Sequence, residues 1–407
     1  MILNFMRRLD YWMGIPLCFL LTVINFVLGL FFSKMANNDS PKKILFIKPS
    51  EMGGILLSHS LICRIKEKYP KAEMFFLAFT SNKPIFDVLD SVPIRNVFTI
   101  RDDSFCGFMK DVAATLFKIR KEKIDVTYDL EFFSRFTAII SYLSGASKRI
   151  GFYRYTFEGL YRGGLATHKI QYNPHIHIAD LFLSMAQVSK GLKKDTPEYV
   201  PDSNSVKTVL PQFVPTEEQK KNISSRLRKL GAPEGSRLFL VNPGEGRIPL
   251  REWPLDNFIM LARRFLEKEN NYIILVGTDK YPHKTRELLL DALQKKRCID
   301  LSGKTSILEL LTLFTMADAL ITNDSGLAHL ASLTGIRQFV FFGPESPRVF
   351  SPLGDNVHIF YSSLPCSPCL SAYNHRRSAC RDNQCLKSIG PQEVCDAILE
   401  KCLHEQI

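Results

Sequence analysis

The 407-residue chain has no internal repeat, no low-complexity block and no collagen-type glycine pattern. Fibrous and intrinsically disordered classes are therefore excluded. The chain also lacks the even cysteine pairing of a secreted disulfide-stabilised protein, because six of its ten cysteines lie in the last 42 residues. This distribution favours a reducing compartment.

Acidic residues are too few to balance the basic ones: 41 Asp and Glu stand against 53 Lys and Arg, a formal net charge of +12. Such an excess suits a nucleic acid, an anionic membrane surface or a phosphorylated substrate. The sequence contains no helix-turn-helix, no aromatic stacking platform and no zinc-finger spacing, so a nucleic-acid partner is disfavoured. The membrane surface and the phosphorylated substrate remain.

One long apolar run is present. Residues 11–33 carry no charge, and this length is enough to cross a ~30 Å hydrocarbon core as a helix. A cleaved signal peptide has a shorter apolar region, so we expect an uncleaved membrane helix within an anchor and linker at 1–40. Basic residues flank both ends, and the positive-inside rule therefore selects neither orientation. Gly14 and Pro16 also suit a re-entrant or interfacial helix.

Strands and helices alternate through the rest of the chain, and the order breaks only in a polar, proline-containing stretch near 191–215. This rhythm predicts an α/β fold with two Rossmann-like, doubly wound domains and a ligand cleft beyond the strand ends. We expect domains at 41–205 and 206–365, then a cysteine-containing tail with a closing helix at 366–407. The predicted strands are 43–48, 73–79, 124–130, 149–152, 237–242, 272–277, 298–301, 319–322 and 338–342. The predicted helices are 56–69, 110–121, 133–143, 255–267, 284–294, 307–316 and 326–334.

Three segments of the second domain carry residues suited to binding a diphosphate. The segment 319–329, ALITNDSGLAH, reads as a buried strand, a tight turn and a helix start, where backbone N–H groups favour an anion. The segment 241–254, VNPGEGRIPLREWP, offers Arg247 and Arg251, whose fork geometry matches a diphosphate. The segment 341–347, FFGPESP, is a strand end with a proline-fixed turn. Simple N-capping and solvated surface arginines are the alternatives.

In this order, the NPG…RxWP loop, the TNDSGxxH turn and the FGPxxP turn resemble the heptosyltransferase family, glycosyltransferase family 9. The resemblance covers about residues 42–400. It implies GT-B architecture, with an N-terminal acceptor domain and a C-terminal nucleotide-sugar domain. It also implies inverting sugar transfer with no cofactor, from a nucleotide-sugar, commonly an ADP-heptose, to a lipopolysaccharide-type or other lipid-linked glycan acceptor.

By position, the resemblance predicts a set of donor-binding residues in which fixed cations stabilise the leaving diphosphate without a metal. Glu345 stands where relatives usually have Thr. The predicted donor-binding residues are Arg247, Arg251, Asn323, Asp324, Ser325, Gly326, His329 and Glu345.

The first loop departs from the family pattern. The family usually has S-x-x-G-D, with the Asp as candidate general base, but here the loop is Ser50-Glu-Met-Gly-Gly54. Glu51 is the best local replacement, and Asp129 and Glu131 are further candidates at a neighbouring strand end. Gly53, Gly54 and Arg135 are predicted acceptor contacts. A helix cap for Glu51 and a strand-end cap for Asp129 are the plain alternatives.

The tail holds four cysteines, Cys366, Cys369, Cys380 and Cys385, at spacings that suit tetrahedral zinc. An iron–sulfur cluster, disulfides and packed thiols are alternatives.

We therefore expect a glycosyltransferase at the cytoplasmic face of a bacterial inner membrane, where nucleotide-sugars are found. Its partners would be a nucleotide-sugar, a lipid-linked acceptor and the membrane. The alternatives are a GT-B-fold sugar-nucleotide epimerase or hydrolase, and a non-catalytic binding scaffold, which Gly54 favours.

Overall fold

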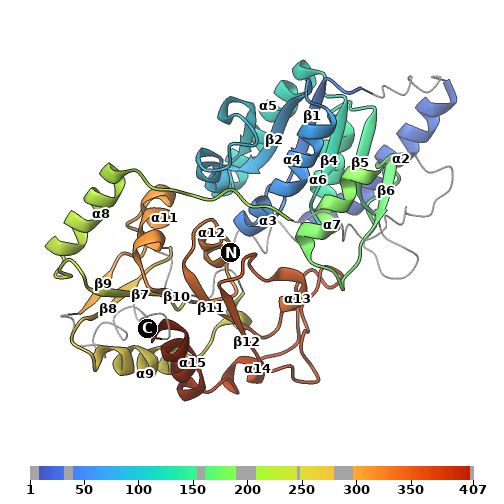
Figure 1. The fold of residues 1–407 in the computed structure, drawn as a ribbon. Coiled ribbons are helices and arrows are strands. Elements are labelled where there is room, and N and C mark those ends of the chain that lie inside the picture. The colour runs from blue at the N-terminus through green and yellow to red at the C-terminus, as the bar shows by residue number, and fades with distance from the viewer. Residues whose placement is uncertain are drawn as a thin grey trace. The chain divides into compact units, whose positions relative to one another are not determined.

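The computed structural model describes residues 9–31, 40–153, 161–188, 208–244, 248–278 and 297–403. The chain divides into two compact units, Met1–Val209 (unit 1) and Leu210–Ile407 (unit 2), shown in Figure 1. The predicted domain boundary at 205/206, the predicted helix 284–294 and Arg247 lie outside the described residues.

Unit 1 is built on a parallel six-stranded sheet of order β3-β2-β1-β4-β5-β6. Its strands are β1 Lys43–Ile47, β2 Glu73–Phe79, β3 Val97–Ile100, β4 Val126–Asp129, β5 Lys148–Tyr153 and β6 His168–Gln171. Its helices are α2 Gly14–Phe31, α3 Met52–Leu57, α4 His59–Lys68, α5 Phe105–Glu122, α6 Arg135–Leu143 and α7 Ile178–Ser184.

Unit 2 repeats this plan, with strand order β12-β11-β10-β7-β8-β9. Its strands are β7 Arg237–Asn242, β8 Asn271–Leu275, β9 Cys298–Asp300, β10 Ala319–Asn323, β11 Arg337–Phe342 and β12 Val357–Tyr361. Its helices are α8 Glu217–Lys229, α9 Leu255–Leu266, α11 Ile307–Met316, α12 Gly326–Ala331, α13 Pro347–Phe350, α14 Gln384–Lys387 and α15 Pro391–Leu403. Both sheets are parallel and doubly wound, as predicted.

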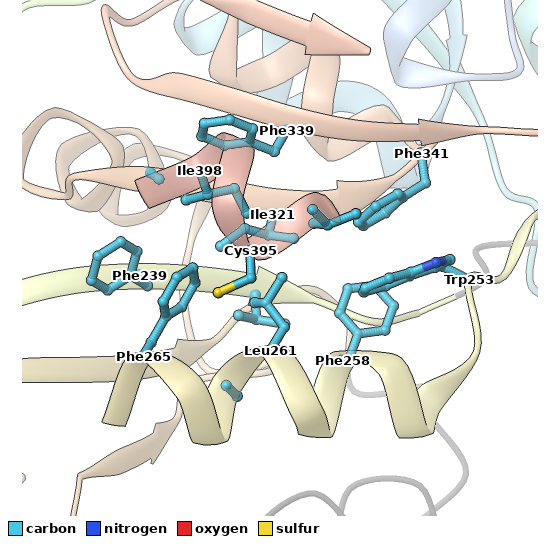
Figure 2. Close-up of a cluster of buried hydrophobic side chains, with 14 of the residues drawn as sticks. Phe239, Trp253, Phe258, Leu261, Phe265, Ile321, Phe339, Phe341, Cys395 and Ile398 are labelled. Atoms are coloured by element: carbon cyan, nitrogen blue, oxygen red, sulfur yellow. The ribbon is translucent and has the colours of Figure 1, made fainter. Parts of the chain in front are cut away.

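The strands are apolar on both faces because helices cover both faces of each parallel sheet. In unit 2, alternate residues of β7, β10 and β11 form one side of a buried cluster, and α9 and α15 supply the other side (Figure 2). Trp253 stacks on Phe341 with ring centroids 4.2 Å apart, which anchors the loop after β7 to the sheet. In unit 1, a corresponding cluster joins β1 and β2 to α5 and α6.

Strand order decides where functional loops meet. In unit 1 the chain winds outward from β1 in both directions, so the loops after β1 and β4 leave neighbouring strand ends; Ile47 lies opposite Asp129. In unit 2 the neighbouring strands β7, β10 and β11 end at Asn242, Asn323 and Phe342. The pairs β1/β4 and β7/β10 therefore bring together loops that are about 80 residues apart in sequence.

The predicted helix 56–69 is instead two helices, because α3 ends at Leu57 and α4 begins at His59. The predicted helix 326–334 ends early, at Ala331. One helix, Leu9–Phe31, is long and apolar enough to cross a membrane by length and composition, with a mean hydropathy of 2.3.

Candidate functional site

A cluster of two arginines and two carboxylates lies at the strand ends of unit 2. Arg251 Nη2 contacts Glu345 Oε1 at 2.5 Å, and Arg251 Nε lies 3.4 Å from Asp324 Oδ2. Arg376 Nε contacts the same Glu345 oxygen at 3.1 Å. Asp324 follows β10, Glu345 follows β11, and Arg251 comes from the loop after β7. The three motifs therefore meet, through their charged side chains, at one edge of the sheet.

Burial controls the charge state of this cluster. Glu345 is fully buried, and burial raises its pKa to about 7; Arg251 lowers the pKa and Asp324 raises it. Burial also raises the pKa of Asp324, against the effect of Arg251. Glu345 Oε2 has no hydrogen-bond partner among the described residues. The cluster thus holds two fixed cations beside carboxyl groups that resist ionisation, which is a suitable environment for an incoming diphosphate.

Asn323 holds the loop after β7 in place. Its Oδ1 accepts from the Trp253 backbone N–H at 2.9 Å, and its Nδ2 donates to the carbonyls of Pro243 and Gly244 at 3.1 and 3.2 Å. The side chain is completely buried. These hydrogen bonds position the loop that carries Arg251, and the donor contact of Asn323 stays a prediction.

Ser325 begins α12 but does not cap it with its side chain. Its Oγ instead lies 3.3 Å from Asn242 Nδ2 and 3.2 Å from Thr322 Oγ1, so it joins β7 to β10. His329 is largely buried within α12, which has six residues. The donor roles of Ser325, Gly326 and His329 stay predictions, and Arg251 and Arg376 provide the charge at this edge.

The first loop of unit 1 is organised by a buried lysine. Lys48, with no exposed side-chain surface, lies 3.0 Å from Glu131 and 3.6 Å from Glu51. Glu131 Oε1 also accepts from the backbone N–H of Ser50 at 2.9 Å and from its hydroxyl at 2.6 Å. Glu131 is thereby committed to holding the loop, whereas 39% of the Glu51 side chain is exposed. Of the three candidate bases, Glu51 is the one presented to solvent.

Glu51 has a strained backbone. Its φ of 62° is in the region that favours glycine, and such conformations cost about 1–3 kcal/mol and cluster at functional sites. Two residues on, Gly53 and Gly54 lie buried in α3. A Cβ on Gly54 would lie 2.5 Å from Lys48 Cε. Lys48 thus occupies the space that a side chain at position 54 would need, so a glycine fits there and a larger residue would displace Lys48. The acceptor roles of Gly53 and Gly54 stay predictions.

Two predicted site residues have structural roles. Asp129 is buried; its Oδ2 pairs with Arg162 and accepts from Thr137 Oγ1 at 3.1 Å. Arg135, with 2% of its side chain exposed, pairs with Asp10 at 3.3 Å. Both side chains take part in buried ion pairs, and the roles of Asp129 as base and Arg135 as acceptor contact stay predictions.

The four tail cysteines are free thiols, and Cys385 is buried. Among the residues that the structure describes, no three His, Cys, Asp or Glu side chains are placed to hold a metal ion. Zinc binding by Cys366, Cys369, Cys380 and Cys385 stays a prediction.

Arg376 was not identified from the sequence, because nothing in its local pattern marks it. The tail reaches the β11 turn through the backbone N–H groups of Cys369 and Leu370, which both donate to the Pro344 carbonyl, at 3.0 and 2.8 Å. This contact brings Arg376 beside Glu345.

The two Rossmann-like units give the chain the GT-B-type fold of a solved heptosyltransferase structure. The chain belongs to glycosyltransferase family 9 (heptosyltransferase), whose sequence profile matches residues 116–379. This match confirms the predicted resemblance to glycosyltransferase family 9, from which the fold and the enzyme class were expected.

Similar proteins cover nearly the same length. Lipooligosaccharide heptosyltransferase 2 of Haemophilus influenzae is 24% identical over 320 residues, 78% of this chain and 87% of that protein. Lipopolysaccharide heptosyltransferase 2 of Escherichia coli is 23% identical over 378 residues, 89% and 99% of the two chains. The solved structure of E. coli ADP-heptose lipopolysaccharide heptosyltransferase II superposes with a TM-score of 0.69 at 21% identity, covering 90% of this chain and all of that one.

Proposed function

We propose that this glycosyltransferase transfers a heptose from ADP-heptose to a lipopolysaccharide-type acceptor, at the cytoplasmic face of a bacterial inner membrane. The relatives named above support the donor and acceptor class. The observation that carries the proposal is the pair of arginines, Arg251 from the loop after β7 and Arg376 from the tail, that both contact Glu345 in unit 2. Guanidinium groups bind phosphate oxygens by paired hydrogen bonds.

We assign the donor diphosphate to the Arg251–Arg376 cluster. As the glycosidic bond to the diphosphate breaks, negative charge grows on the leaving oxygen, and fixed cations in a buried setting stabilise that charge. Two guanidinium groups supply this stabilisation from the protein itself. We therefore propose transfer without a catalytic metal ion: addition of EDTA should leave the rate unchanged, and a rate restored only by Mg²⁺ or Mn²⁺ would contradict the proposal.

We assign the general base to Glu51. Its carboxylate accepts the proton of the acceptor hydroxyl while that oxygen attacks the anomeric carbon, and the diphosphate leaves from the opposite face. This single displacement inverts the anomeric configuration, which NMR of the product would report. Lys48 and Glu131 are positioning residues, since they fix the loop on which Glu51 stands.

Substitution of the carboxylates tests this assignment. Glu51→Gln should lower kcat by about 10²–10⁴-fold, the usual contribution of a general base, with ADP affinity unchanged. Glu67→Gln is a matched control, because Glu67 is an exposed carboxylate of α4 paired with Arg64. Wild-type kcat in Glu51→Gln would remove Glu51 from the mechanism.

Gly54 favours a second candidate, a non-catalytic sugar-nucleotide-binding scaffold, because it removes the carboxylate that the family pattern places in this loop. A protein that binds ADP-heptose but gives no product with any lipopolysaccharide core acceptor would support that candidate. Release of free heptose without transfer would instead indicate a hydrolase.

A further inference from the structure

The N-terminal apolar helix is fixed to unit 1 at its first turn. Asp10 Oδ1 accepts a hydrogen bond from the Phe136 backbone N–H at 2.8 Å, and Asp10 Oδ2 accepts from Arg135 Nη1 at 3.3 Å. The Arg135 guanidinium also lies over the Tyr11 ring, 5.6 Å from its centroid. The Asp10 carboxylate thus accepts from a free backbone N–H group in the first turn of α6 and also pairs with the buried guanidinium of Arg135.

A second set of contacts follows further along α2. Cys18 is completely buried against Ala138, Ile139 and Leu165. Thr22 Oγ1 accepts from the Gly164 backbone N–H at 2.9 Å. A Cβ on Gly163 would lie 2.4 Å from the Thr22 hydroxyl, so the two backbones approach closely. Contact with unit 1 therefore extends from Asp10 to Thr22, about 18 Å of helix at 1.5 Å per residue.

These contacts are incompatible with a helix that crosses the membrane. A spanning helix holds its two ends on opposite sides of a ~30 Å core. Here the first end contacts unit 1 through Asp10, while the second end, Phe31, leads within twelve residues into β1 of the same unit. The part of the helix beyond Thr22, residues 23–31, is only about 14 Å long, less than half of that core.

The outer surface of the apolar helix Leu9–Phe31, which includes α2, consists of large apolar side chains. Trp12, Phe19, Phe26 and Phe31 are 72%, 63%, 67% and 78% exposed. No charged residue occurs from 11 to 33. A protein interface has a polar rim, which this surface lacks, whereas hydrocarbon requires an uncharged face. The net charge of +12 adds attraction to anionic headgroups.

We infer that α2 is a monotopic membrane helix: its inner face stays bound to α6, and its outer face inserts into one leaflet of a lipid bilayer. Both ends of the helix then lie on the side of the catalytic units. Unit 1 is held at the surface through a rigid contact. The inference refines the membrane location in the proposed function, and its tests do not measure sugar transfer, so the two can fail separately.

Topology gives the first test. Epitope tags are placed at the N-terminus and C-terminus of the full chain in cells. Both tags should be digested by protease in inverted inner-membrane vesicles and both protected in intact spheroplasts. An N-terminal tag cleaved in spheroplasts, with the C-terminal tag protected, would overturn the inference.

Vesicle binding gives the second test. The double variant Phe19→Glu/Phe26→Glu should lose co-sedimentation with phosphatidylethanolamine–phosphatidylglycerol vesicles. The control Val214→Glu changes a side chain that is 79% exposed in unit 2 and should bind as wild type does. Wild-type vesicle binding by the double variant would overturn the lipid assignment.

The native Cys18 thiol reports whether the helix stays docked. Mass spectrometry after maleimide treatment should find Cys18 unlabelled in wild type and in Phe19→Glu/Phe26→Glu, which shows that lost vesicle binding does not come from undocking. Asp10→Ala should leave Cys18 open to labelling, with exposed Cys106 as an internal reference. Equal labelling of Cys18 and Cys106 in wild type would contradict the docked helix.

Discussion

The pH dependence of stability at Glu345 tests whether burial or ion pairing with arginine has the larger effect on its pKa. Glu345 Oε1 contacts two arginines, whereas Oε2 has no hydrogen-bond partner among the described residues. A reading from contacts alone would make this carboxylate stabilising at neutral pH. Burial instead raises its pKa from 4.5 to about 7, with Arg251 opposing and Asp324 adding to the rise.

The sign of the stability effect follows from proton binding. Between pH 4.5 and 7 the folded protein keeps the Glu345 proton while the unfolded chain has lost it, so the free energy of unfolding falls as pH rises. One pKa unit corresponds to about 1.4 kcal/mol, and the whole effect is therefore on the order of 3 kcal/mol. The contribution is fully present below pH 4.5 and is lost by pH 7 and above.

Glu345→Gln replaces the protonated form with an isostere that does not titrate. Thermal unfolding at pH 4.5, 6 and 8 should show the variant equal to wild type at the lowest pH and more stable by up to about 3 kcal/mol at the highest. Glu67→Gln, at an exposed carboxylate of α4, serves as control. A variant less stable than wild type at pH 8 would refute the reasoning, since it would show that the arginines outweigh burial.

Three further results are expected. Trp253→Phe removes the hydrogen bond from Nε1 to the Ile389 carbonyl, 3.0 Å long, within the Figure 2 cluster; it should lower stability by about 2–4 kcal/mol, measured by thermal denaturation. Asp129→Asn weakens the buried pair with Arg162 and should lower the free energy of unfolding by about 3 kcal/mol, measured by thermal denaturation; a folded variant that loses kcat would support Asp129 as the base. If the tail cysteines bind zinc as predicted, elemental analysis should find about one zinc per chain, lost in Cys385→Ser; a metal-free wild type would contradict that prediction.

The fold was largely predictable because strand and helix signals are local. Strands 73–79 and 237–242 were predicted with their observed bounds, since each has an apolar run between polar or turn residues. Strands β3, β6 and β12 were not predicted: β3 and β6 have only four residues each, and polar residues such as His168, Lys169 and His358 interrupt the apolar runs of β6 and β12. Such strands form because a neighbouring strand offers its hydrogen bonds, and sequence patterns do not contain that information.

The site was only partly predictable for the same reason. Arg251, Asp324 and Glu345 belong to motifs at strand ends, so strand order alone brings them together. Arg376 and Lys48 act through contacts with carboxylates far along the chain. Arg135 is predicted as an acceptor contact from its place beside a candidate site, and the local pattern gives no sign of its ion-pair partner Asp10, which lies 125 residues earlier.

The most direct test of heptose transfer uses the purified full chain, ADP-heptose and a lipopolysaccharide core acceptor truncated before its heptose. Mass spectrometry of the acceptor and quantification of ADP are carried out together for wild type and Glu51→Gln. The account predicts one added heptose per ADP released by wild type, and a rate lower by about 10²-fold or more in Glu51→Gln. ADP release without any gain in acceptor mass would contradict it.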